Sequence, residues 1–218
     1  MANSAAQRKN MVESQVRPSD VTDRRIMAAM QNLARETFVP EALQPLAYMD
    51  EALYVAPGRA MIAPRNLARL IQLAQIEQTD VVLNVGALNG YSAALLSTLA
   101  KSVVALESDP GCTAQLSKCI ADNGLTNVTV AKGDLAGGYP AGAPYDVVWI
   151  EGAVEQIPDA LAAQLSAQGR IVGVAFSDGV ARSAIWRRDG SGGLNRRCMF
   201  EADAPLLPGF TTLKGFVF

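Results

Sequence analysis

The sequence contains no histidine and only three cysteines. Without an imidazole the chain cannot form His-ligated metal sites, nor the Ser-His and Cys-His pairs that activate nucleophiles, so we predict no metal site. The cysteines, Cys112, Cys119 and Cys198, form no C-x-x-C pair, and their odd number argues against a disulfide framework. We expect free thiols in a reducing compartment and chemistry that works without histidine.

Positive charge and long apolar runs are also scarce. The 218 residues carry a formal net charge of −2, which gives no electrostatic support for nonspecific nucleic-acid binding. No apolar run reaches the roughly 18–20 residues of a membrane span, and the opening MANSAAQRKN lacks the apolar core of a signal peptide. We therefore expect a cytoplasmic protein that binds neither nucleic acid nor membrane. The sequence does not indicate the oligomeric state.

The first third of the chain is typical of helices with extended connections. Ser19 and Thr22 are candidate N-caps for a helix with an apolar stripe at Ile26, Met30 and Leu33. A proline suited to the first turn of a further helix precedes apolar residues at i, i+3, i+4 and i+7 spacing. These positions are Pro64, Leu67, Leu70, Ile71 and Ala74. We assign residues 1–79 to an N-terminal helical segment that packs on the core.

From residue 80 onward, short apolar strands alternate with helices. The strands are expected at 81–86, 102–107, 128–132, 145–151 and 170–176, and the helices near 90–100, 110–123 and 155–166. This alternation predicts an α/β fold with a doubly wound parallel sheet covered on both faces. A glycine-rich turn beyond Asp178 predicts a C-terminal antiparallel hairpin. Residues 80–218 then form the core, in one compact domain overall with the N-terminal segment.

A glycine loop follows the first of these strands, in the stretch DVVLNVGALNGYSAALL. Gly86 and Gly90 allow a tight turn and close approach of a ligand, next to the free N–H groups of a helix start. Glu107 ends the second strand, 21 residues after Gly86, where an acceptor for ribose hydroxyls is expected. Asp134, after the third strand, can accept from an adenine amino group. An adenosine-containing ligand is favoured, but the spacing leaves both NAD and S-adenosylmethionine open.

Motifs outside this loop resemble those of the protein-L-isoaspartate O-methyltransferase family. Residues 11–53 resemble its N-terminal region, and residues 133–161 resemble its Gly-Asp, Ala-Pro-Tyr and Ile-Pro segment. The residues that carry the N-terminal resemblance are Met11, Val12, Gln15, Asp23, Arg25, Ala29, Met30, Phe38, Val39, Pro40, Tyr48 and Asp50. The match runs over most of residues 10–200, with several motifs in the family's order.

The resemblance implies a Rossmann-like methyltransferase fold and methyl transfer from S-adenosylmethionine to isoaspartyl carboxylates in peptides or proteins, a repair reaction. Such a carboxylate is already ionised at pH 7, so the reaction needs no general base and positioning dominates. The segment implied to face the substrate is Ile62, Ala63, Pro64 and Arg65. The residues implied to bind the cofactor are Asn84, Gly86, Ala87, Leu88, Gly90, Glu107, Ser108, Asp134, Leu135 and Glu151.

Three positions depart from the family pattern. Asn84 replaces an acidic residue, Leu88 replaces the central loop glycine, and Ile62 replaces a serine. We expect Leu88 to need a positive φ and to project toward the ribose or methionine moiety, so that Leu88→Gly tightens cofactor binding. Because rules broken at a site can signal changed function, a non-catalytic binding or regulatory family member stays open. An NAD-dependent enzyme rests only on the loop and Glu107.

Overall fold

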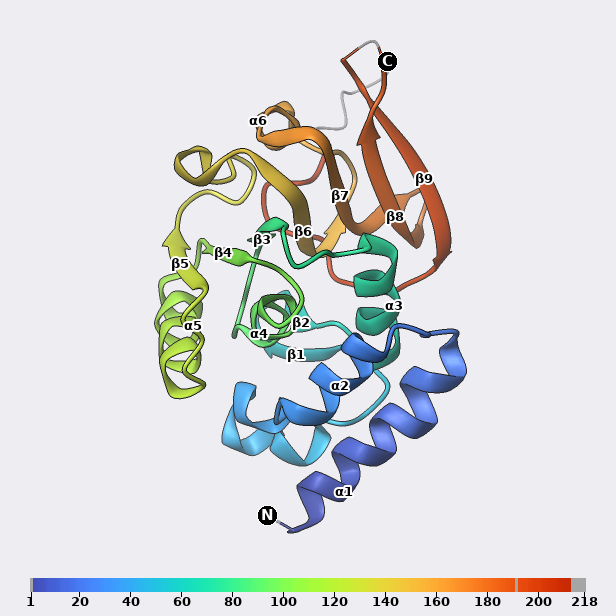
Figure 1. Ribbon diagram of the computed structural model, residues 1–218, viewed down its shortest axis with the longest axis vertical. Coiled ribbons are helices and arrows are strands. Elements are labelled where there is room, and N and C mark those ends of the chain that lie inside the picture. Colours follow the sequence, from blue (N-terminus) through green and yellow to red (C-terminus); the bar gives the residue numbers. More distant parts are fainter. Residues whose placement is uncertain (1, 191, 213–218) are drawn as a thin grey trace.

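The computed structural model describes residues 2–190 and 192–212, and a seven-stranded sheet forms its centre (Figure 1). Its strand order is β5-β4-β3-β6-β7-β8-β9, parallel from β5 through β7 and antiparallel at the last two pairings. The strands are β3 (Val81–Val85), β4 (Ser102–Glu107), β5 (Val128–Lys132), β6 (Tyr145–Val154), β7 (Leu165–Ser177), β8 (Val180–Arg188) and β9 (Leu194–Glu201). The predicted fold class is confirmed, with the hairpin formed by β8 and β9. Because β3 lies between β4 and β6, strand order reverses at its carboxyl end, which is where such sheets bind ligands.

A separate two-stranded sheet, β1 (Leu53–Ala56) with β2 (Arg59–Met61), precedes the main sheet. The helices are α1 (Ala2–Met11), α2 (Arg24–Asn32), α3 (Pro64–Ala74), α4 (Tyr91–Ser97), α5 (Pro110–Asp122) and α6 (Asp159–Ala163). A π-helical turn lies at Val12–Val16, and 3-10 turns lie at Arg17–Ser19, Arg35–Phe38, Glu41–Leu46 and Pro140–Gly142.

Two local predictions were wrong. The side chain that caps α2 is Asp23, which accepts the N–H of Arg25 at 2.8 Å, rather than Ser19 or Thr22. The helix expected at 155–166 shrinks to α6, because β6 extends to Val154 and β7 already begins at Leu165. Tyr145 N donates to the Gln164 carbonyl at 2.8 Å, so pairing of β6 with β7 takes up the end of that segment.

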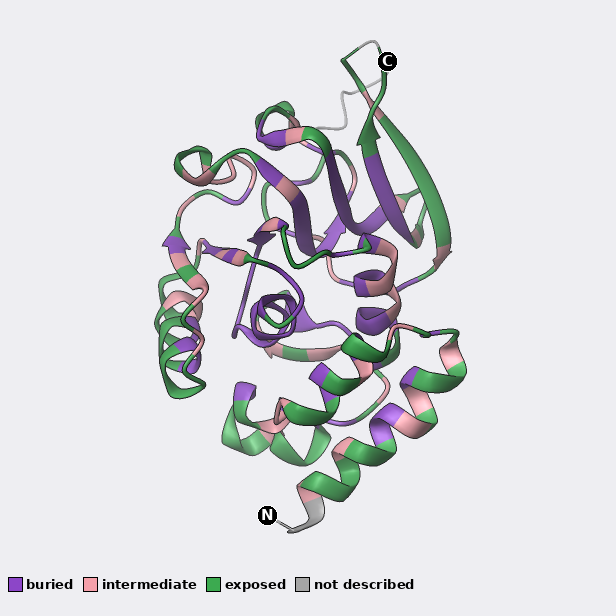
Figure 2. Ribbon diagram, viewed as in Figure 1, coloured by how far each residue is buried: buried purple, intermediate pink, exposed green. Residues whose placement is uncertain are grey.

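The strands β3, β4 and β6 are mostly buried, whereas β9 at the edge of the sheet is mostly exposed (Figure 2). Successive apolar residues of β3 alternate between two core clusters. Val82 joins the cluster that contains the apolar residues of α3, α4 and α5, whereas Leu83 and Val85 join the cluster that contains Leu161 of α6. Apolar residues of the N-terminal segment, such as Phe38, share the first cluster, so this segment packs on the core. The boundary between residues 79 and 80 remains a prediction. Over the described ranges, no helix is both long and apolar enough to cross a bilayer.

Candidate functional site

The loop between β3 and α4 is built from left-handed residues. Gly86 has φ 75°, Leu88 has φ 53° and Gly90 has φ 90°. The N–H groups of Gly86 and Ala87 both donate to the Leu106 carbonyl, at 2.9 and 3.0 Å, which ties the loop to the end of β4. The loop therefore runs beside the carboxyl end of β4.

Leu88 has the expected positive φ, but its two ends face different surroundings. Its side chain is buried and lines a cavity of about 400 Å³ together with apolar residues that include Phe38, Val55 and Cys112. Its N–H donates to Oε2 of Glu107 at 2.8 Å. The backbone of Leu88 thus stabilises the Glu107 carboxylate through a hydrogen bond, while its side chain packs between the loop, β1 and the start of α5.

Glu107 is fully buried at the end of β4, and both of its carboxylate oxygens are engaged. Oε1 accepts from the N–H groups of Ser108 and Asp109, and Oε2 accepts from Leu88 N. Burial by itself raises the pKa of Glu107, but hydrogen bonds from Arg59 and from backbone N–H groups outweigh burial and hold this pKa below its ordinary value. Glu107 is therefore a buried carboxylate at neutral pH.

Arg59 of β2 completes this arrangement, and it was not singled out from the sequence. Its Nη1 lies 3.1 Å from Oε1 of Glu107 and its Nη2 lies 2.9 Å from Oε2, a bidentate ion pair. Nη2 also donates to the Gly86 carbonyl at 2.9 Å. Arg59 is only 6% exposed. The available signal was an arginine in the otherwise apolar run from Arg59 to Ile62, because a charge in a buried strand needs a partner.

Leu207, in the segment after β9, lies against the same glycine loop. A Cβ placed on Gly86 would lie 3.4 Å from both Leu207 methyl groups, and one placed on Gly152 of β6 would lie 2.6 Å from Leu207 Cγ. The segment is held by backbone hydrogen bonds from Ala153 N to the Pro205 carbonyl at 2.8 Å and from Leu207 N to the Ala153 carbonyl at 2.9 Å. The close approach that these glycines permit is therefore made by the chain itself.

The remaining predicted cofactor residues differ in their surroundings. Asn84 is fully buried, and neither of its side-chain amide atoms has a hydrogen-bond partner in the described residues. Glu151 points to α4, where Oε1 accepts from Ser92 Oγ, and Oε2 accepts from Trp149 Nε1, both at 2.7 Å. Burial raises the pKa of Glu151 despite these two hydrogen bonds. Asn84 keeps unused hydrogen-bonding capacity, whereas Glu151 is already paired.

After β5, the predicted adenine-binding residues form a short turn. Asp134 is exposed, and its Oδ2 accepts from Gly137 N at 2.9 Å, so one of its oxygens stabilises its own loop. Leu135 is buried in the second core cluster. Ser108, partly buried after β4, donates its N–H to Glu107.

The segment predicted to face the substrate is mostly internal. Ile62, Ala63 and Pro64 are buried, whereas Arg65 is exposed at the start of α3 and its Nη1 lies 3.3 Å from Asp50 Oδ2. Arg35, itself fully buried, donates to the Ile62 carbonyl at 2.9 Å. Arg35 therefore fixes the backbone of this segment, and Arg65 is the member that can contact a solvent-borne ligand.

These contacts test whether the residues accept S-adenosylmethionine. A ribose diol would offer its two O–H donors to the Glu107 carboxylate. Arg59 places one guanidinium nitrogen on each of the two Glu107 oxygens, beside three backbone N–H groups, so a diol could pair with both oxygens only in place of the guanidinium. In this arrangement the site does not accept a ribose, although the donor and acceptor types are those that the cofactor requires.

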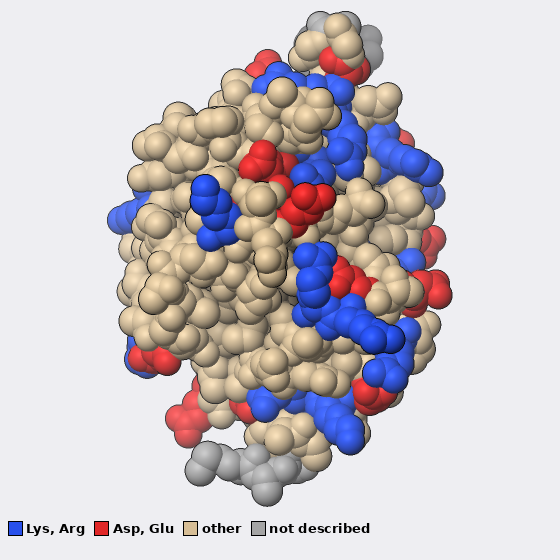
Figure 3. Space-filling view, in the orientation of Figure 1, with Lys and Arg blue, Asp and Glu red and all other residues tan. Residues whose placement is uncertain are grey.

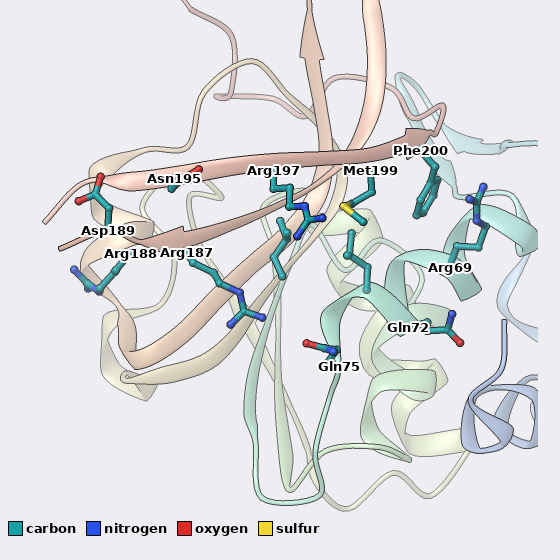
Figure 4. Close-up of a pocket in the computed structure, with 12 residues that line it drawn as sticks. Arg69, Gln72, Gln75, Arg187, Arg188, Asp189, Asn195, Arg197, Met199 and Phe200 are labelled. Atoms are coloured by element: carbon teal, nitrogen blue, oxygen red, sulfur yellow. The ribbon is translucent and has the colours of Figure 1, made fainter. Parts of the chain in front are cut away.

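A larger cavity of about 740 Å³ lies elsewhere, between α3 and the β8–β9 hairpin (Figure 4). Its lining includes Arg69, Arg187, Arg188 and Arg197. The guanidinium of Arg69 stacks on the Phe200 ring, with Cζ 3.7 Å from the ring centroid. Figure 3 shows Lys and Arg side chains gathered over this side of the molecule. The cavity contains none of the predicted site residues.

Comparison with known proteins decides the family. The model of the family described as protein-L-isoaspartate(D-aspartate) O-methyltransferase matches residues 6–181. The chain belongs to this family. Among curated relatives, the protein-L-isoaspartate O-methyltransferase of Herpetosiphon aurantiacus is 38% identical over 166 residues, covering 76% of this chain and 74% of that relative. The enzyme of the same name from Protochlamydia amoebophila is 40% identical over 162 residues, covering 74% of this chain and 77% of the relative.

Solved structures show the same fold. A protein-L-isoaspartate O-methyltransferase superposes with a TM-score of 0.81 at 21% identity, covering 93% of this chain and 66% of that one. A putative family member from Plasmodium falciparum, solved in complex with S-adenosyl-L-homocysteine, gives a TM-score of 0.77 at 16% identity, covering 91% and 97%. At these identities the likeness concerns the fold, and it confirms the Rossmann-like methyltransferase architecture.

Proposed function

We propose that this chain is an S-adenosylmethionine-dependent carboxyl O-methyltransferase of the protein-L-isoaspartate repair type, acting on isoaspartyl-containing peptides or proteins. The observation that carries the proposal is the family match over residues 6–181, which spans β3 through β7 and the glycine loop. A buried carboxylate at the end of β4, Glu107, supports an adenosine-type ligand. The absence of histidine does not oppose it, because the acceptor carboxylate is ionised at pH 7.

For the substrate, the proposal rests on Ile62, Ala63, Pro64 and Arg65. Arg65 is the exposed member and carries a guanidinium, which suits recognition of a carboxylate. The proposed cofactor residues remain the predicted set around Gly86, Glu107 and Asp134. The cytoplasm remains the proposed location, since free cysteines suit a reducing compartment.

The test is transfer of a labelled methyl group to an isoaspartyl peptide beside its aspartyl twin, with the wild type and Arg59→Gln. We expect transfer to the isoaspartyl peptide alone. Arg65→Gln should raise KM for the peptide severalfold, while Arg69→Gln, one turn further along α3, serves as the matched control. Absence of transfer by both the wild type and Arg59→Gln would refute the proposed activity.

The comparisons do not favour the alternative of a non-catalytic binding protein. One structural observation bears on it, namely that Arg59 pairs with Glu107 and Leu207 lies against Gly86, two residues predicted to bind the cofactor. A binding protein without cofactor would show no heat with S-adenosylhomocysteine in any variant, and no methyl transfer.

A further inference from the structure

We propose that Arg59 and Leu207 form an internal plug of the cofactor site, in which the Arg59 guanidinium occupies the ribose-diol position on Glu107. S-adenosylmethionine then binds only when Arg59 leaves the carboxylate. This inference rests on the proposed function for the identity of the ligand.

The chemistry of the guanidinium matches that of the group it replaces. A ribose presents two neighbouring O–H donors to a carboxylate, and Arg59 presents two N–H donors in a fixed fork at 3.1 and 2.9 Å. The guanidinium also adds a positive charge, so its pairing with buried Glu107 is stronger than that of a neutral diol. The cofactor must therefore compete with a charged internal ligand for one carboxylate.

The location of Arg59 permits its release without loss of the main sheet. Arg59 belongs to the two-stranded sheet of β1 and β2, which pairs separately from the seven strands. The turn before it contains Gly58 at φ 65°, and the register of the hairpin shifts between Tyr54 and Ala56. Displacing Arg59 breaks its contacts with Glu107 and Gly86, while the three backbone N–H groups continue to stabilise the Glu107 carboxylate.

Leu207 closes the other side of the glycine loop. Its methyl groups approach Gly86, and Gly152 lies beneath its Cγ, so it fills the space into which a ligand would pack. Leu207 is 1% exposed, and its carbonyl accepts from Phe210 N at 3.2 Å in the same segment. The plug thus has a polar part from β2 and an apolar part from the chain after β9.

Calorimetry with S-adenosylhomocysteine on the full chain tests the plug. We expect Arg59→Gln and Arg59→Ala to bind at least tenfold more tightly than the wild type, because apparent affinity falls with the fraction of open molecules. Arg59→Lys keeps the charge but loses the planar fork, so it should give an intermediate gain and guards against misfolding of the neutral variants. Urea unfolding shows whether each variant is folded.

The matched control is Arg170→Gln. Arg170 is similarly buried, at 8%, and pairs with Asp80 at 2.8 Å at the opposite end of β3. The Arg170→Gln variant loses a comparable buried ion pair, so it would also bind more tightly if a general loss of stability were enough to raise the affinity. We expect its affinity for S-adenosylhomocysteine to stay within twofold of that of the wild type. When Glu107 is already replaced by Gln, adding Arg59→Gln should increase the logarithm of the affinity for S-adenosylhomocysteine by less than half as much as it does in the wild type. The reason is that Arg59 affects binding through its contact with Glu107.

Several outcomes overturn the plug. Equal affinity of the wild type and the Arg59 variants, an equal gain in Arg170→Gln, or no binding by any folded Arg59 variant each contradicts it. The proposed function fails separately. If Arg59→Gln binds S-adenosylhomocysteine more tightly than the wild type but transfers no methyl group, the plug is supported and the proposed activity is refuted. If the wild type transfers methyl groups and binds S-adenosylhomocysteine as tightly as Arg59→Gln does, the activity is supported and the plug is refuted.

Discussion

At the glycine loop, backbone strain at a residue with positive φ can be offset by the packing of its side chain. Leu88 is the clearest case, since an L-residue with a side chain rarely adopts φ 53° and strain there is of order 1–3 kcal/mol. Its buried side chain offsets that strain by filling apolar space beside Phe38. The sequence suggested the strain, but only the structure shows where the isobutyl group points.

At position 88 we therefore expect the usual order of alanine and glycine to be reversed. Leu88→Ala loses the packing and keeps the strain, whereas Leu88→Gly loses the packing and relieves the strain. Leu88→Gly should be more stable than Leu88→Ala by about 1 kcal/mol in urea unfolding. Leu83, buried in β3, is the control, and there the alanine variant should be the more stable. The same order at both positions would contradict this account.

Two buried glutamates should shift the pH dependence of stability in opposite directions. The folded pKa of Glu107 is lowered, so its contribution is present above the unfolded pKa of about 4.3 and is lost as pH falls through the folded value. The folded pKa of Glu151 is raised by burial, so its contribution is present below about pH 4.3 and is lost as pH rises.

Urea unfolding across pH 3–8 measures both effects. Glu107→Gln should flatten the loss of stability on the acid side. Glu151→Gln should gain relative to the wild type as pH rises above about 4.3. A pH profile of either variant parallel to that of the wild type would show that the glutamate concerned does not titrate differently on folding.

The elements of the fold depend on a few positions where backbones or helices meet closely. Gly90 caps α4 at φ 90°, and a Cβ there would lie 2.8 Å from Leu116 Cδ1 of α5. Gly124, after α5, also has positive φ, but nothing lies within 4 Å of its Cβ position. A substitution at Gly124 therefore strains only the backbone, whereas a substitution at Gly90 strains the backbone and also forces a contact with α5.

Gly90→Ala should accordingly destabilise the protein more than Gly124→Ala. Both substitutions incur left-handed strain of about 1 kcal/mol. Gly90→Ala also forces Leu116 to move, which adds about 1–3 kcal/mol. Thermal or urea unfolding of the two variants gives the difference, and equal destabilisation would mean that α5 accommodates the methyl group without cost.

At the scale of the whole molecule, Arg170 joins parts that lie far apart in the sequence. From β7 it donates to Asp80 before β3, to the Ala74 carbonyl at the end of α3 and to the Gln75 carbonyl at 2.7 Å. It thereby fixes the end of the N-terminal segment to the amino ends of β3 and β7, at the opposite end of the strands from the glycine loop.

Arg170→Gln should lower the free energy of unfolding by about 3 kcal/mol, because it leaves Asp80 buried without its charged partner. The exposed Arg188, which donates to the Ala162 carbonyl, is the control, and Arg188→Gln should change stability by less than about 0.5 kcal/mol. Equilibrium urea unfolding compares the two, and a small effect of Arg170→Gln would show that water satisfies Asp80.

Sequence patterns by themselves determined the alternation of strands and helices from β3 to β7, the C-terminal hairpin and the acidic residue at the end of β4. Each depends on local periodicity, capping or spacing, and these are properties of neighbouring residues. The family motifs are likewise contiguous, so they could be recognised without coordinates.

Tertiary structure alone decided what those site residues touch. Arg59 lies 48 residues before Glu107, and Leu207 lies 121 residues after Gly86, yet both meet at the glycine loop. No local pattern encodes such a contact, because it depends on how the β1–β2 hairpin and the segment after β9 pack against the sheet. The sequence therefore predicted where a cofactor site belongs, and the packing decided that Arg59 pairs with Glu107 and that Leu207 lies against Gly86.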